Sequence, residues 1–300
     1  MTILKPITPA AVQAPGSTLG EGPCWDSRTN HMYWVDIEGA RIHRYSPATG
    51  ETDTYEAPEK ISALIPCAQG GWVATAYHAL YHWNTGDETF EEILRFKLPD
   101  NVRFNDGKAG PDGALWIGTM DMSSGQPIGS LYRVDEQLQV EEKVTGIYCS
   151  NGLDWSPDNS EMYYIDSGVK EVRAYAFDLA TGSLGERRTA VQLPEEGSGV
   201  PDGMSLDEEG MIWVAEWGGH RVARWNPHNG ELLAAVQLPV PQPSSCAFGG
   251  EHYNMLFMTS AAAGLPAEQR SRYPLSGALF QAVDGLKVHG RPPFQYAWRK

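Results

Sequence analysis

The chain has 300 residues, with 23 Lys plus Arg against 38 Asp plus Glu, so its formal net charge is −15. An acidic surface repels nucleic-acid phosphates and anionic membranes, and no apolar run approaches the roughly 18 residues of a transmembrane helix. Hydrophobic residues make up 41% of the chain and charged residues 20%, a composition that supports a packed core and excludes a disordered chain.

The N-terminal segment, Met1 to Ile7, lacks the charged-then-apolar order of a secretory signal, from which we expect a cytoplasmic protein. The cysteines fit that expectation. Cys24, Cys67, Cys149 and Cys246 stand far apart, without a C-x-x-C pair. They are therefore expected to be free thiols rather than disulfides or zinc ligands.

A short aromatic segment then recurs six times along the chain. Its reference positions are Trp34, Trp72, Trp116, Tyr164, Trp213 and Phe257. Turn residues precede these segments, and alternating strands such as 40–45, 129–134, 172–177 and 220–225 follow them. Repeats of about 50 residues, each with four short strands, are typical of propeller blades. We therefore predict an all-β fold, a six-bladed β-propeller with four antiparallel strands per blade, as one domain over residues 1–300.

The residues after Phe257 bear on the number of blades. A seventh blade would need another aromatic strand after Phe257. The segment 278–280 instead predicts an outer strand of the sixth blade. Residues 261–274 predict a long loop within that blade, and the sequence assigns this loop no function.

Polar residues stand at the predicted start of the inner strand in four blades: Glu21, Asn105, Asn151 and Asp202. Ser62 and Ser245 occupy similar offsets in the other two blades. Inner strands of a propeller start near the central channel, so these side chains are expected to meet at one mouth of it. The neighbouring glycines also allow a second interpretation, in which the asparagine and aspartate residues simply mark turns. Glutamate is a poor turn former, so Glu21 favours the shared site.

Two carboxylates brought together repel each other unless a cation lies between them. Glu21, Asp202 and the amide oxygen of Asn151 would supply three oxygen ligands to one divalent ion. Such ligands favour Ca²⁺, Mg²⁺ or Mn²⁺, with Zn²⁺ tolerated, and the sequence does not select among these ions. His220 and Glu216, near the end of the fifth aromatic segment, are weaker candidates for the same mouth. Serine-hydrolase, zinc-protease and P-loop motifs are absent from the sequence.

Six motifs together resemble the SMP-30/gluconolactonase/regucalcin family of sugar lactonases. They begin at Leu19-Gly-Glu-Gly-Pro, Arg103-Phe-Asn-Asp-Gly, Trp116-Ile-Gly-Thr-Met, Ser150-Asn-Gly-Leu-Asp, Pro201-Asp-Gly-Met and Ser245-Cys-Ala-Phe-Gly-Gly. The resemblance implies a six-bladed propeller, a metal held by Glu21, Asn151 and Asp202, and substrate contacts from Arg103 and Asn105.

The chain departs from the family pattern after Met120. Regucalcin-like members have a substrate-contacting glutamate there, whereas this chain continues with Asp121, Met122 and Ser123. Asp121 or Ser123 is expected to replace that glutamate. The segment 272–280 resembles bacterial aldonolactonases of pentose and hexose oxidation.

We therefore expect metal-dependent hydrolysis of a monosaccharide aldonolactone, as in gluconolactonases and arabinonolactonases, with Asp202 also acting as general base. The expected partner is a small-molecule sugar lactone, and the sequence leaves self-association open. Two alternatives remain: a non-catalytic propeller that binds Ca²⁺ or a protein partner, and a propeller esterase that acts on another ester.

Overall fold

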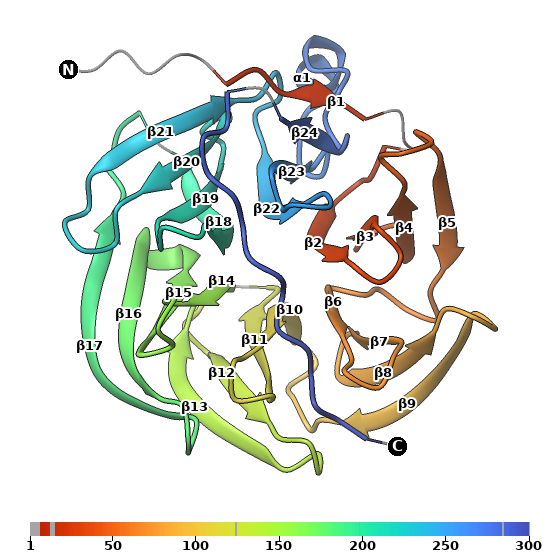
Figure 1. The fold of residues 1–300 in the computed structure, drawn as a ribbon, viewed down its shortest axis with the longest axis vertical. Coiled ribbons are helices and arrows are strands. Elements are labelled where there is room, and N and C mark those ends of the chain that lie inside the picture. The colour runs from red at the N-terminus through yellow and green to blue at the C-terminus, as the bar shows by residue number, and fades with distance from the viewer. Residues whose placement is uncertain (1–6, 13–15, 124, 198, 284, 300) are drawn as a thin grey trace.

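The computed structural model describes residues 7–12, 16–123, 125–197, 199–283 and 285–299. Its strands form six four-stranded antiparallel sheets, arranged as blades around a central axis (Figure 1). The predicted six-bladed β-propeller is thus confirmed. Met1 to Pro6, on which most of the cytoplasmic expectation rests, lie outside the described residues. No helix among the described residues is long and apolar enough to span a membrane.

The first five blades each consist of four strands that follow one another in the sequence. The first two are β2 (Gly20–Asp26), β3 (His31–Asp36), β4 (Arg41–Tyr45), β5 (Thr52–Glu56), and β6 (Ala63–Pro66), β7 (Trp72–Thr75), β8 (Ala79–Asn84), β9 (Thr89–Arg95). The third and fourth are β10 (Val102–Ala109), β11 (Leu115–Asp121), β12 (Gly129–Val134), β13 (Val140–Ile147), and β14 (Ser150–Trp155), β15 (Glu161–Asp166), β16 (Glu171–Asp178), β17 (Ser183–Gln192). The fifth is β18 (Val200–Leu206), β19 (Ile212–Trp217), β20 (Arg221–Trp225), β21 (Leu232–Gln237), and a 3-10 turn, η1 (Ser167–Val169), follows β15.

The sixth blade closes the ring with strands from both ends of the chain. It comprises β22 (Pro243–Gly249), β23 (Met255–Ser260), β24 (Phe280–Ala282) and β1 (Ala10–Ala11). The outer strand predicted at 278–280 lies in the sixth blade but begins two residues later, as β24, and β1 pairs along its outer edge. The loop predicted over 261–274 also contains a short helix, α1 (Ala267–Arg272).

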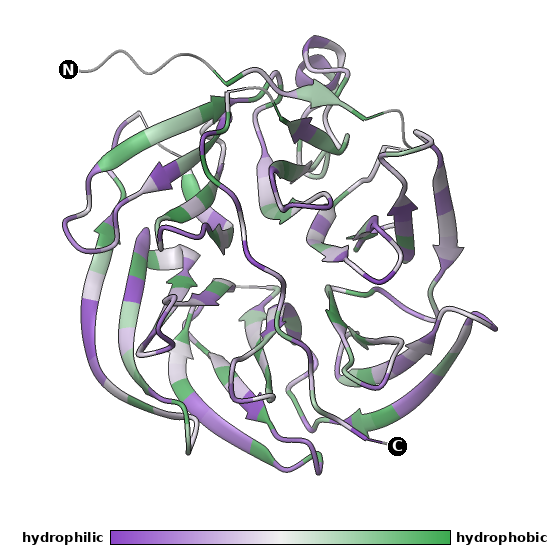
Figure 2. Cartoon of the chain, viewed as in Figure 1, coloured by the Kyte–Doolittle hydropathy of each residue, from purple (hydrophilic) through white to green (hydrophobic). Residues whose placement is uncertain are grey.

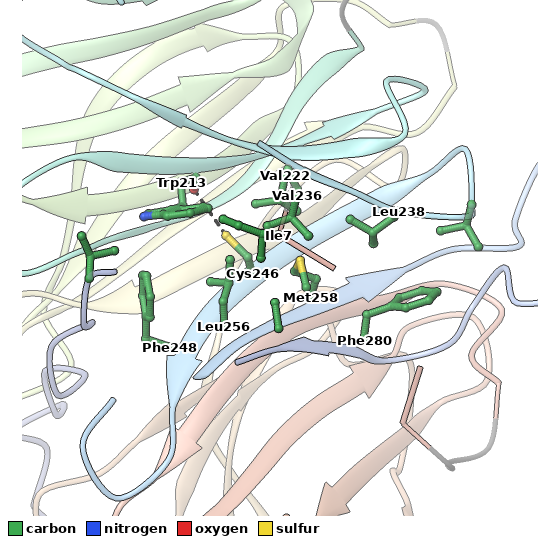
Figure 3. Close-up of a cluster of buried hydrophobic side chains, with 14 residues drawn as sticks. Ile7, Trp213, Val222, Val236, Leu238, Cys246, Phe248, Leu256, Met258 and Phe280 are labelled. Carbon is green, nitrogen blue, oxygen red and sulfur yellow. Dashed lines mark hydrogen bonds between the residues drawn. The ribbon is translucent and has the colours of Figure 1, made fainter. Parts of the chain in front are cut away.

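The aromatic residues of the repeat form the core between the blades. Each of the six reference aromatics lies on the second strand of its blade and is at most 1% exposed. Figure 3 shows one such cluster, in which Trp213 and Val236 of blade five meet Cys246 and Met258 of blade six. Outer strands such as β13 and β17 instead carry long hydrophilic stretches (Figure 2). Burial of aromatic side chains between neighbouring blades therefore holds the ring together.

The C-terminal segment, residues 286–299, crosses one face of the propeller from blade five to blade two (Figure 1). The backbone amide of Glu208 donates a hydrogen bond to the carbonyl of His289. The backbone amide of Tyr296 donates one to the carbonyl of Pro66, at the end of β6. Arg291 reaches the carbonyl of Trp155, at the end of β14. This segment thus covers the face where the inner strands end. It does not cover the opposite face, where the inner strands begin.

Candidate functional site

Irregular pairing marks the inner strands where the predicted site residues lie. The register shifts between Glu21 and Cys24 in β2, between Phe104 and Gly107 in β10, between Ser150 and Leu153 in β14, and between Pro201 and Met204 in β18. A bulge redirects side chains of a strand away from strict alternation. Asn105, Asn151 and Asp202 therefore lie in bulged strands, and the interpretation of these sequences as turns is wrong.

Gly152 shows why one of these bulges requires glycine. A Cβ atom at this position would lie 2.6 Å from the backbone nitrogen of Met204 and 2.9 Å from the carbonyl oxygen of Asp202. Only a residue without a side chain lets β14 approach β18 so closely. The Asn151-Gly152 pair thus brings the Asn151 amide near Asp202 on the neighbouring blade.

One pocket of about 300 Å³ lies at this mouth of the channel. Its polar lining comprises Glu21, Arg103, Asn105, Asn151, Ser167 and Asp202. Its remaining lining is largely apolar and comes from Leu19, Ile37, Met120, Cys149, Val200, Pro201 and Trp217. Residues from four blades, distant in the sequence, therefore meet around one cavity as the repeat geometry predicts.

Both pocket carboxyl groups have raised pKa values. Burial and the nearby carboxylate of Asp106 raise the pKa of Glu21 to about 8. Burial, followed by the charges of Glu21 and Asp106, raises the pKa of Asp202 well above its usual range. Such a set of carboxyl groups holds its full negative charge only when a positive charge balances it.

Hydrogen bonds fix the amide and guanidinium groups of the pocket. Arg103 Nη1 donates to the carbonyl of Phe104 at 2.8 Å and to Asn105 Oδ1 at 2.9 Å. Asn105 Nδ2 in turn donates to the carbonyl of Ser150 at 2.8 Å, which links blade three to blade four. Arg103 and Asn105 are therefore held as one unit at the pocket wall.

Asn151 is oriented by Ser167. Its Nδ2 donates to Ser167 Oγ at 2.9 Å, and Ser167 Oγ donates to the carbonyl of Pro201 at 2.7 Å. With the amide nitrogen committed in this way, the side-chain oxygen of Asn151 is the atom that can serve as a ligand.

The chemistry of these donors fits a hard divalent cation. Two carboxylates that repel each other, beside an amide oxygen, are the oxygen ligands that Ca²⁺, Mg²⁺ and Mn²⁺ prefer. Across the described part of the chain, no group of three or more His, Cys, Asp or Glu side chains is disposed to hold a metal. The candidate set differs from such a group because its third member is an amide.

The structure does not bring Asp121 into the pocket. Its carboxylate accepts hydrogen bonds from Asn101 Nδ2 at 2.9 Å, from the amide of Ser123 at 3.0 Å and from the amide of Gln126 at 3.0 Å. Ser123 is exposed, and its hydroxyl also donates to Asp121. Both residues shape their own loop, and the neighbouring Met120 lines the pocket instead.

The other polar residues suggested by the sequence do not line this pocket. Glu216 is fully buried and accepts a hydrogen bond from Arg221 Nε at 2.8 Å, so its visible role is to pair β19 with β20. His220 lies beside the site in a second pocket. Ser62 bonds to Thr75 at 2.8 Å, and Ser245 lines a separate cavity near the ends of the inner strands.

Sequence reasoning missed Asp106 and the apolar wall. Asp106 follows Asn105 directly and precedes a glycine, a pattern that does not separate a site residue from a turn residue. Cys149 had no signal beyond being a lone cysteine; burial raises its pKa to about 12, which keeps the thiol protonated. Met120 and Trp217 are typical strand residues, and only the ring arrangement places them at the pocket.

Comparisons with known proteins identify the family and the fold. Residues 19–262 match the model of the SMP-30/gluconolactonase/LRE-like region. The chain is 37% identical over 287 residues to regucalcin of Gallus gallus, covering 93% of this chain and 95% of that protein. It is 32% identical over 282 residues to YvrE of Bacillus subtilis (strain 168), whose name provisionally assigns it to the sugar lactone lactonases, covering 94% of this chain and 96% of that protein. The solved structure of a calcium-binding protein, regucalcin, from Agrobacterium tumefaciens superposes with a TM-score of 0.90 at 27% identity, covering 99% of both chains.

Proposed function

The chain belongs to the SMP-30/gluconolactonase/LRE-like family, and on that premise we propose that it hydrolyses a monosaccharide aldonolactone to the aldonic acid with the aid of one divalent cation. A single observation carries the proposal. Glu21, Asn151 and Asp202 meet Arg103 and Asn105 in one pocket at the channel mouth. Carboxylates with a cation-ligating amide, next to a fixed guanidinium, match what ester hydrolysis requires.

Glu21, Asn151 and Asp202 would hold the cation through their side-chain oxygens. When bound there, the ion would polarise the lactone carbonyl and would let both carboxylates remain ionised. Ca²⁺, Zn²⁺, Mn²⁺ and Mg²⁺ are all compatible with this ligand set.

Asp202 would accept the proton of the attacking water. The water oxygen would bond to the lactone carbonyl carbon, the bond from that carbon to the ring oxygen would break, and the ring oxygen would take up the proton that Asp202 returns, to become a hydroxyl group. Arg103 and Asn105, already linked to each other at 2.9 Å, would hydrogen-bond the sugar hydroxyls and the new carboxylate. A neutral lactone also suits a protein with a net charge of −15.

The test compares Glu21→Gln and Asp202→Asn with a control, Glu186→Gln, on the exposed face of β17. Each change removes one charge and keeps the side-chain size. Opening of several aldonolactones is followed with a pH indicator, in metal-free protein to which each divalent ion is added in turn. The two pocket variants should lose at least about 100-fold in kcat/KM, while the control and the circular dichroism spectra stay unchanged. Full activity of either pocket variant, or of chelator-treated protein, would falsify the proposal.

The named relatives also favour a second candidate, a propeller that binds Ca²⁺ without catalysis, since one similar structure is described as a calcium-binding protein. This candidate predicts calcium binding that Glu21→Gln weakens, with no turnover of any lactone in the same screen. Calorimetric titration with Ca²⁺ beside the activity screen separates the two.

A further inference from the structure

The sixth blade carries an insertion on the face that holds the site. In every blade the second strand ends on this face, so the connection to the third strand lies beside the channel mouth. In blade six that connection spans residues 261–279, whereas in the other blades it spans only 37–40, 76–78, 122–128, 167–170 and 218–220. Long connections on a rigid scaffold commonly carry binding function.

The first part of this insertion is anchored to its neighbours. The amides of Ala262 and Ala263 both donate to the carbonyl of Thr18, two residues before β2. Gln242, which is 5% exposed, donates from Nε2 to the carbonyl of Ala263 at 3.0 Å. The insertion therefore stands in a fixed position next to the segment that carries Glu21.

A second pocket of about 500 Å³ lies between this insertion and the turn from β19 to β20. Trp217 lines both this pocket and the pocket of Glu21 and Asp202. The two cavities are thus neighbours that have Trp217 in common.

The lining of the second pocket is aromatic and hydrogen-bonding. The ring of Tyr273 lies 5.3 Å from the ring of His220, and the guanidinium of Arg272 lies 5.3 Å from the same tyrosine ring. Gln242 and Gln269 add two amides. Among the described lining residues of this pocket, none is a carboxylate. Flat rings beside amide and guanidinium groups suit a neutral, hydroxyl-rich ring, which presents C–H faces and hydroxyl edges.

We propose that this second pocket binds a second sugar residue, attached to the lactone that occupies the first pocket. The substrates would then include glycosyl-substituted aldonolactones, the lactones of oxidised disaccharides. The lactone end of this proposal rests on the proposed function, while the second pocket can be tested by binding alone.

The test uses two variants and three ligands. Tyr273→Ala removes the aromatic wall, and Tyr148→Ala is the control, because Tyr148 is 38% exposed and lines neither pocket. Initial rates are measured with glucono-1,5-lactone, maltobiono-1,5-lactone and melibiono-1,5-lactone, which differ in the presence and linkage of the second sugar. We expect Tyr273→Ala to lower kcat/KM about tenfold for at least one disaccharide lactone and to leave the monosaccharide lactone within about twofold of the parent protein.

Binding of the open-chain acids gluconate, maltobionate and melibionate is measured by calorimetry on the same proteins. If no lactone is hydrolysed but a disaccharide acid binds more tightly than gluconate, and Tyr273→Ala removes the difference, the second pocket stands and the lactonase function fails. If glucono-1,5-lactone is hydrolysed and Tyr273→Ala affects all ligands equally or none, the second pocket is overturned while the lactonase function stands. If nothing is hydrolysed and no acid binds, both are overturned.

Discussion

His43 is a titratable side chain in surroundings that disfavour its charge. It lies on β4, is 1% exposed, and its ring packs 4.9 Å from the ring of Trp34. Its Nδ1 pairs with Thr54 Oγ1 at 2.9 Å, while Nε2 has no hydrogen-bond partner among the described residues. Burial accordingly lowers the pKa of His43 to about 4. The folded protein therefore holds this imidazole neutral at pH values where the unfolded chain protonates it.

This difference predicts a pH-dependent stability. The contribution of His43 is fully present above its unfolded pKa of about 6.5 and is lost as pH falls from there towards 4. Between pH 7 and pH 5 the charge-free burial of His43 should cost the parent protein roughly 2 kcal/mol of unfolding free energy. We expect His43→Gln to lose less stability over this range, by roughly the same 2 kcal/mol. Urea unfolding at both pH values measures it, with the exposed His228→Gln as control. Equal pH dependence in the parent protein and His43→Gln would show that this imidazole is not the group responsible.

At the scale of the strand, predictions from the sequence match the structure where a pattern repeats in every blade. They fail where an element or residue lies outside the repeat. Glu21, Asn151 and Asp202 could be located by counting back from the blade aromatics, because circular symmetry turns equal offsets into equal positions around the axis. The strand β1 could not be predicted in this way, since two residues at its position carry no periodic signal. Asp121 illustrates the same limit. Its position suggested a substrate contact, but its carboxylate accepts hydrogen bonds from the amides of its own loop and stabilises that loop.

The bulge in β14 leads to a prediction about the inner strand as an element. Gly152→Ala would place a methyl group 2.6 Å from the backbone nitrogen of Met204, and backbone cannot yield as a flexible side chain can. Forced separation of β14 from β18 should cost about 1–3 kcal/mol of unfolding free energy and should move the Asn151 amide away from Asp202.

Denaturant unfolding and lactone turnover measure both effects of Gly152→Ala. Gly16→Ala is the matched control, because a methyl group there meets nothing within 4 Å. A variant at Gly152 with parent-like stability and parent-like activity would mean that the inner strands do not need this close approach.

For the whole molecule, the two faces of the propeller differ in what they carry. One face gathers the starts of the inner strands into the candidate site, and the other is crossed by residues 286–299. Within that crossing segment, Tyr296 is fully buried, packs in the cluster around Phe104 and Ile117, and donates its hydroxyl to the carbonyl of Asp135 at 2.6 Å. This one side chain therefore joins blades two and three on the face away from the site.

Tyr296→Ala should lower the unfolding free energy by about 3–5 kcal/mol, since it removes a large buried ring and leaves a cavity between two blades. Lactone turnover per folded molecule should stay within about twofold of the parent protein, because the change lies at the ends of the inner strands and not at their starts. Denaturant titration and activity at low temperature, where the variant remains folded, test the two statements separately. Parent-like stability of the variant would show that Tyr296 does not stabilise the contact between these blades. A stable fold with strongly reduced turnover would instead show that the covered face and the site are coupled through the channel.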